Sequence, residues 1–202
     1  MKLKGDWYFD GYEGRSVPGA DGRPRRQLVY TGEYYGLAGG RNPRTLKLLS
    51  TAAAAVYLGC YILCAMNRCA VSLTVYAGVP VMLSVIPAFW LLIGLGCLWP
   101  AGTEMTVRVF YSSLRRMQRA VLFIVPLLGI GLAGSLVRLI LEPALFASPS
   151  DLLYTLYTAA AFGSAVFELL LLKKNPVVVV RDPQPGSLRI GELEETQRKK
   201  KK

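Results

Sequence analysis

The sequence contains no histidine and only four cysteines among its 202 residues. The lack of histidine excludes imidazole-based metal sites and histidine-based acid–base catalysis. Four cysteines in a chain of this length are too few for a secreted scaffold built on disulfides. The cysteines form no C-x-x-C pair, so a zinc or redox site is not expected. The sequence therefore predicts neither a metal nor another cofactor.

Recognisable catalytic residue sets are also missing. A serine or cysteine nucleophile needs a neighbouring base, and without histidine only lysine or a carboxylate remains for that role. The closely spaced carboxylates lie in polar tails, where solvation explains them: Asp6, Asp10, Glu192, Glu194 and Glu195. Residues 129–134 spell G-x-G-x-x-G, but they lie inside an apolar run without the strand and helix start of a dinucleotide site. We therefore expect a protein that is not an enzyme.

Long apolar runs dominate what the sequence does contain. The chain is 52% hydrophobic, yet it carries 24 Lys and Arg against 13 Asp and Glu. That apolar content excludes a disordered chain. Four runs have about the 20 residues that a helix needs to cross a bilayer, at roughly 47–66, 77–99, 120–141 and 152–172. We predict an all-α membrane protein whose residues 47–172 form a four-helix transmembrane bundle.

The basic residues are distributed unevenly around these runs. Nine lie in residues 1–47, four in the connection 100–119, and nine follow residue 172. Only Arg68 and Arg138 fall on the opposite side. The positive-inside rule therefore predicts that both termini are cytoplasmic, in a multi-pass protein of the plasma (cytoplasmic) membrane. Residues 1–44 lack the apolar core of a signal peptide, so the first span is expected to be retained.

An ionisable residue inside a span is a functional hypothesis by default, and Glu168 is the clearest case. It lies about one helical turn from the cytoplasmic end of the fourth run, at roughly 1.5 Å per residue. We expect it to pair with a nearby cation, namely Lys173, Lys174 or Arg119. A proton or cation site is the alternative.

A second charged group lies near the outer end of the third run. Arg138 is expected to pair with Glu142, four residues later on the same helix face. Arg138 and Glu168 should lie some 20 Å apart in depth, from the same helical rise. The middle of the bilayer then lacks charge, which argues against a proton relay that crosses the membrane.

Small residues recur at four-residue spacing, which lets helices approach closely in lipid. The three patterns that we select for helix packing are Ala55-x-x-x-Gly59, Gly129-x-x-x-Ala133 and Ala159-x-x-x-Gly163. We expect them to pack within one bundle, with homodimerisation or partner docking as the alternative. Pro87 removes a backbone donor near the middle of the second run and is expected to kink that helix.

The connection 100–119 has the pattern of a basic amphipathic helix that leads into the third span. Apolar residues recur every three or four positions from Val107 to Val121, and the other faces carry Arg108, Arg115, Arg116 and Arg119. This helix is expected either to lie on an anionic inner leaflet or to extend the third span. Its basic residues are candidates for lipid or partner contacts.

The two terminal segments, 1–46 and 173–202, contain short strand-like runs at 27–31, 33–35, 177–180 and 187–190. Such short strands are not stable alone, so we expect a small mixed sheet that caps the bundle on its cytoplasmic side. The chain ends in four lysines, Lys199, Lys200, Lys201 and Lys202. Near an anionic leaflet each contributes about 1 kcal/mol of binding, and nucleic acid is a less suitable partner for so short a tail.

These features favour a non-catalytic accessory or scaffolding subunit of a membrane. It would engage a partner protein through its helices and cytoplasmic tails, or assemble with further copies of itself. The alternative is a small transporter or channel protomer that forms a pathway by oligomerising. In that case Glu168 would line the pathway.

Overall fold

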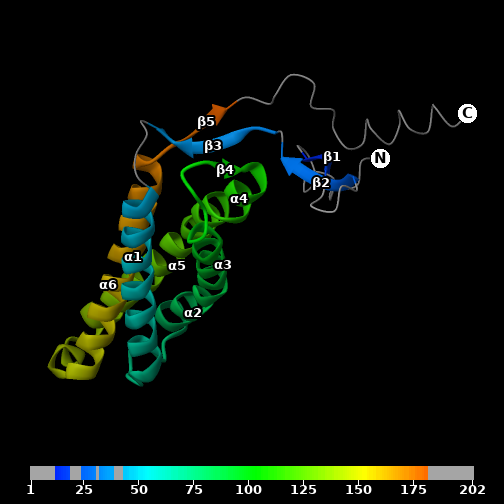
Figure 1. Cartoon of the computed structure of the whole chain (residues 1–202). Helices are drawn as coiled ribbons and strands as arrows, with labels where there is room; N and C mark the ends of the chain where they lie inside the picture. Colours follow the sequence, from blue (N-terminus) through cyan, green and yellow to red (C-terminus); the bar gives the residue numbers. More distant parts are fainter. Residues whose placement is uncertain (1–11, 19–23, 31, 39–42, 182–202) are drawn as a thin grey trace, which may run out of the picture.

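The computed structural model of the chain describes residues 12–18, 24–30, 32–38 and 43–181. Three groups singled out above lie outside these residues: the four terminal lysines, the strand expected at 187–190, and the carboxylates Asp6, Asp10, Glu192, Glu194 and Glu195. Helices make up most of the described chain (Figure 1). Their bounds are α1 Pro43–Met66, α2 Val75–Leu83, α3 Val85–Leu98, α4 Val107–Ser112, α5 Leu114–Leu141 and α6 Pro149–Lys174, with a 3-10 turn at Pro143–Ala147.

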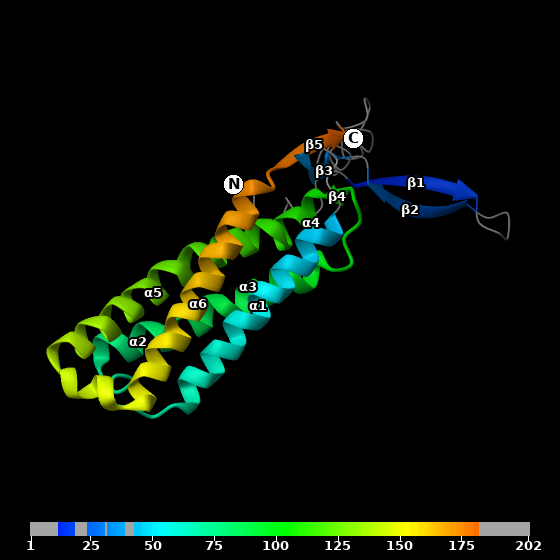
Figure 2. The same cartoon turned by 90° about the vertical axis from the view of Figure 1, so that its left-hand side faces the viewer.

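Four helical stretches are long and apolar enough to cross a membrane, as the four apolar runs predict. They comprise α1, α2 with α3, α4 with α5, and α6. They lie side by side in one bundle (Figure 2). The helix α6 packs along both α1 and α5, α5 packs along α2 and α3, and α1 contacts α3.

The spans are longer at several ends than their apolar runs suggest. Helix α1 begins at Pro43 and α6 begins at Pro149. Proline suits the first turn of a helix because its missing N–H would have no partner inside the helix there. Helix α5 begins at Leu114 rather than near 120.

The second span is interrupted at Ser84, between α2 and α3. The sequence predicts a kink at Pro87. A proline ring clashes with the helical carbonyl four residues earlier, so the helix breaks in the turn that precedes Pro87. The Tyr57 hydroxyl donates to the Ser84 carbonyl oxygen at 3.2 Å. It also lies 2.9 Å from the Ser84 Oγ. A side chain of α1 therefore supplies hydrogen bonds where the helix is broken.

Two glycines of α5 allow this helix to approach α2 closely. A Cβ atom placed on Gly131 would lie 2.6 Å from Val81 Cγ2. One placed on Gly134 would lie 2.6 Å from the backbone oxygen of Tyr76. Neither position has room for a side chain without a shift of the neighbouring helix.

The small-residue patterns selected from the sequence are mostly on the outside of the bundle. Ala55, Gly59, Ala133 and Gly163 are exposed, and nothing lies within 4 Å of a Cβ placed on Gly59 or Gly163. For these four residues the prediction that they pack inside the bundle is therefore wrong. The exceptions are two half-buried residues, Gly129, which faces Phe162, and Ala159.

A three-stranded sheet covers one end of the bundle, the end where α1 begins and α6 ends (Figure 1). Its order is β4–β3–β5, with β3 Tyr34–Leu37 in the centre, β4 Met105–Thr106 on one side and β5 Val177–Arg181 on the other. The hypothesis that the two terminal segments share a sheet is confirmed by β3 and β5. The sheet is antiparallel throughout, however, so the expectation of a mixed sheet is wrong.

The remaining strand pair is a separate antiparallel hairpin of β1 Tyr12–Pro18 and β2 Pro24–Tyr30. The strand expected at 27–31 is therefore part of this hairpin and not of the sheet over the bundle.

We call the sheet β4–β3–β5 together with α4 the cap.

The expected amphipathic helix of the connection 100–119 is divided at Ser113, which separates α4 from α5. Leu114, Met117 and Val121 are buried in the bundle. The apolar face therefore packs against other helices, and the segment from Leu114 extends the third span. Phe110 of α4 stacks on Tyr35 of β3, with ring centroids 4.8 Å apart, and so joins the helix to the sheet.

Candidate functional site

Glu168 is buried in the interior of the bundle, with 2% of its surface exposed. Neither of its carboxyl oxygens has a hydrogen-bond partner among the described residues, and the Ser50 hydroxyl of α1 has none either. The two groups lie near each other but do not reach hydrogen-bond geometry. The expected ion pair with Lys173, Lys174 or Arg119 is not formed. That prediction is wrong because Glu168 points into the bundle and not toward its basic end.

The position of Glu168 follows from the spacing of the buried residues of α6. Ala161, Ala165, Glu168 and Leu172 are all buried, and their intervals of three and four residues place them on one helix face. Helix α1 presents a matching face, since Lys47, Ser50, Ala54 and Tyr57 are buried at the same intervals. The sequence alone therefore contained a signal that Glu168 is buried, because it occupies a core position of this repeating pattern.

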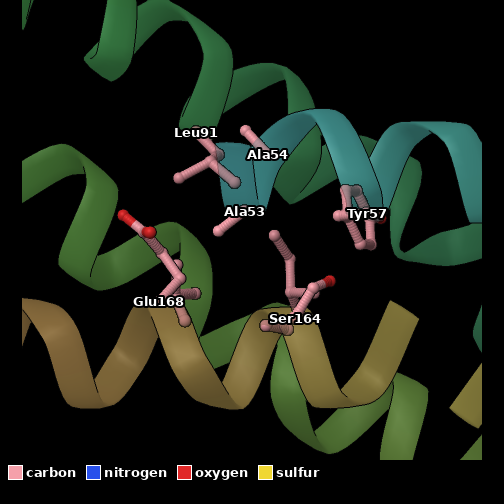
Figure 3. Close-up of a pocket in the computed structure, with 9 residues that line it drawn as sticks. Ala53, Ala54, Tyr57, Leu91, Ser164 and Glu168 are labelled. Atoms are coloured by element: carbon pink, nitrogen blue, oxygen red, sulfur yellow. The ribbon is translucent and has the colours of Figure 1, made fainter. Parts of the chain in front are cut away.

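A small cavity lies beside Glu168 (Figure 3). Its volume is about 10 Å³, at the lower limit of the roughly 10–15 Å³ needed for one water molecule. All four spans contribute to its lining: Ala53, Ala54 and Tyr57 from α1, Leu91 from α3, Val121 and Ile124 from α5, and Ser164, Ala165 and Glu168 from α6. The small side chains that face Glu168 create this space.

Among the described residues, the only other buried side-chain atom without a hydrogen-bond partner is Arg138 Nε, and Arg138 is held by its ion pair with Glu142. The Lys47 ammonium donates to the backbone oxygens of Trp99 and Ala101. Those oxygens follow the C-terminus of α3, where a cation is favoured by the helix dipole. At the opposite end, Asp151 Oδ1 accepts from the Val71 amide at 2.8 Å.

Arg138 and Glu142 form the ion pair that their spacing predicts, with 2.8 Å between Nη1 and Oε1. Both side chains are partly exposed at the end of the bundle away from the cap. The pair therefore has no contact with Glu168, and exposed ion pairs of this kind contribute little to stability.

The cap is held together by aromatic and polar contacts. The Tyr35 hydroxyl donates to the Glu33 carboxylate at 2.7 Å, and this bond is the main reason that the pKa of Tyr35 is raised to about 12. The Val107 amide donates to the Tyr30 hydroxyl at 3.2 Å, which links α4 to the end of β2.

The outer strand of the cap presents apolar side chains. Val178, Val179 and Val180 of β5 are exposed by 44–54%. Among the described residues, β5 pairs only with β3, so its second edge has no strand partner. Unpaired edges of this kind are templates for another strand.

Basic side chains gather at the cap end of the bundle. Arg108 lies on α4, Arg116 is half-buried and Arg119 is exposed on the first turns of α5. Arg115 lies over the Tyr111 ring, 5.1 Å from its centroid. The basic candidates for lipid or partner contacts therefore lie at the same end as β5.

Comparison of the chain with protein-family models, curated proteins and solved structures finds no match. The described residues contain no cluster of three or more metal-ligating side chains. Arguments about function therefore depend on two features of this chain: the carboxyl inside the bundle and the edge of the cap.

Proposed function

We propose that the protein is a non-catalytic membrane subunit that inserts through four spans and binds a partner protein on its cap. The observation that carries this proposal is the exposed edge strand β5 at the end of the bundle. Both termini and the cap face the cytoplasm in this proposal.

Insertion in a bilayer accounts for the outer surface of the bundle. Large apolar side chains are exposed along every span, for example Ile62 of α1, Trp90 of α3, Ile140 of α5 and Leu156 of α6. Soluble monomers rarely expose continuous apolar surfaces of this size. Hydrocarbon is the solvent that would stabilise such a surface.

The orientation is supported by where the fold brings basic residues together. The start of α1, the start of α5 and the end of α6 meet at the cap end, and each carries lysine or arginine. The opposite end carries Arg68 and Arg138, and Arg138 is paired with Glu142. By the positive-inside rule the cap end is cytoplasmic.

The partner that suits β5 is an extended segment of a cytoplasmic protein with apolar and acidic side chains. Main-chain hydrogen bonds to a sheet edge supply affinity, and side-chain contacts supply specificity. The valines of β5 offer an apolar contact surface, and the basic residues nearby favour negative charge. A partner strand would also cover an edge that invites aggregation when it is left open.

Site-specific photocrosslinking in living cells tests this docking surface. A photoreactive residue at Val180 is expected to capture one partner protein, and peptide mapping should locate the crosslink in an extended acidic segment. The substitution Val178→Lys should abolish that adduct, because lysine on an edge strand opposes pairing. Val178→Thr is the matched control, since threonine keeps the β-branched shape, and it should retain the adduct.

A photoreactive residue at Val56, on the outer surface of α1, should not give the same adduct. If Val180 crosslinks only to lipid, or equally well in the Val178→Lys variant, the docking proposal is wrong. A crosslink between two copies of this chain would contradict a foreign partner and show self-assembly through β5.

A further inference from the structure

Two polar groups inside the bundle lie apart from the docking surface on the cap. Glu168 and Ser50 come from the two antiparallel helices α6 and α1, and both are almost fully buried. A buried polar group without a hydrogen-bond partner costs about 1–3 kcal/mol, and more when it is charged. Glu168 lines the cavity, and Ser50 is a second unsatisfied polar group on the neighbouring helix, which packing alone does not explain.

The size and lining of the cavity limit what can bind there. A metal cation such as Ca²⁺ takes six or more oxygen ligands, whereas the side-chain oxygens around this cavity are those of Glu168, Ser164 and Tyr57, with Ser50 nearby. The Tyr57 hydroxyl is already bonded to Ser84, and the Ser164 hydroxyl donates to Ala161. A proton needs only the carboxyl itself, with Ser50 as a hydrogen-bond partner.

We propose that Glu168, together with Ser50, forms a reversible proton-binding site inside the bundle. The carboxyl binds the proton on one oxygen, and the Ser50 hydroxyl then hydrogen-bonds the acid. Loss of the proton leaves a carboxylate that needs water from the cap end. That end is about 9 Å away, since six residues of α6 remain after Glu168 at about 1.5 Å each.

The charged and titratable groups of the surrounding helices leave this site without a permanent counterion. On α1 they are Lys47, bound to backbone oxygens, and Tyr57, bound to Ser84. The α2–α3 segment contains no Asp, Glu, Lys or Arg. The basic residues at the start of α5 are Arg115 and Arg119, which are exposed, and Arg116, which is half-buried; Lys173 of α6 is exposed as well.

Infrared spectroscopy of the full-length protein in lipid bilayers tests the proposal directly, because a protonated carboxyl and a carboxylate absorb at different frequencies. Spectra are recorded while pH is raised and then lowered, at constant sodium concentration. The wild type is expected to show a carboxylic-acid band that disappears and returns with pH. Glu168→Gln should lose this band completely. Glu142→Gln is the matched control and should retain it.

Ser50→Ala supplies a readout that general destabilisation would not produce. It should shift the frequency of the Glu168 acid band, since the hydrogen-bond partner of the acid changes, without removing the band. Identical pH-dependent spectra for wild type and Glu168→Gln would overturn the proposal. So would an acid band of Glu168 that never changes with pH, or a carboxylate band that responds to replacing sodium with choline. The last result would assign the site to a metal cation. None of these outcomes depends on the cap, so a failure of the proton-site proposal would not contradict the docking proposal, and the reverse also holds.

Discussion

At the scale of single residues, one side chain connects a neighbouring helix to a broken span. The Ser84 carbonyl already accepts from the Ala88 amide at 3.2 Å, so the bond from Tyr57 is an additional one. Tyr57 reaches across from α1 and bonds to both the carbonyl and the hydroxyl of Ser84. The proline that breaks the helix can be recognised from the sequence, whereas Tyr57 lies 27 residues before Ser84, and no local pattern links the two.

Removing the Tyr57 hydroxyl should therefore weaken the bundle. We expect Tyr57→Phe to lower the free energy of unfolding by about 1 kcal/mol, within the range measured for hydrogen bonds inside membranes. Tyr61→Phe is the matched control, because the Tyr61 hydroxyl makes only a long contact of 3.8 Å with the Met82 sulfur. Reversible unfolding in mixed detergent micelles measures both. Equal losses for the two variants would contradict the role assigned to Tyr57.

Glu168 illustrates what residue-level reasoning from the sequence missed. Its distance from the end of the span suggested a salt bridge with a terminal lysine. The direction of its side chain is set instead by the repeating core positions of α6. The depth of a residue along a helix does not say which face of the helix it occupies. Because the salt bridge was inferred from depth alone, the predicted partner of Glu168 was wrong.

At the scale of elements, the number and approximate place of the spans could be predicted because hydrocarbon thickness sets their length. Their ends could not, because they depend on contacts outside the apolar run. Helix α5 starts at Leu114 because Leu114 and Met117 are buried against other helices. The choice of packing glycines failed for a related reason, since four-residue spacing does not show which face of a helix meets a neighbour.

The contrast between buried and outward glycines leads to a prediction for α5 and α6. Gly134→Ala would place a Cβ atom 2.6 Å from a backbone oxygen of α2, so the helices must separate. We expect a loss of about 1–3 kcal/mol, as for other overpacked cores. Gly163→Ala is the matched control, because nothing lies within 4 Å of its Cβ position, and it should be neutral or stabilising. Equal unfolding free energies for the two variants would contradict the close packing of α5 on α2.

At the scale of the whole molecule, three segments distant in sequence meet at one end of the bundle. The cap combines β3 from before the first span, β4 from the middle connection and β5 from after the fourth. An even number of spans brings the terminal segments to the same end, and this could be predicted from the sequence. The participation of Met105–Thr106 could not, because a two-residue strand has no sequence pattern of its own.

The measurement that tests the central claim most directly is the accessibility of single cysteines to a membrane-impermeant thiol reagent in intact cells. The four native cysteines are replaced by alanine, and one cysteine is introduced either at Val180 of the cap or at Leu73 in the opposite connection, both exposed. We predict that the cysteine at 73 is labelled in intact cells and the cysteine at 180 only after the membrane is permeabilised. Labelling of both positions from the same side, or of position 180 alone in intact cells, would contradict the proposed insertion and orientation.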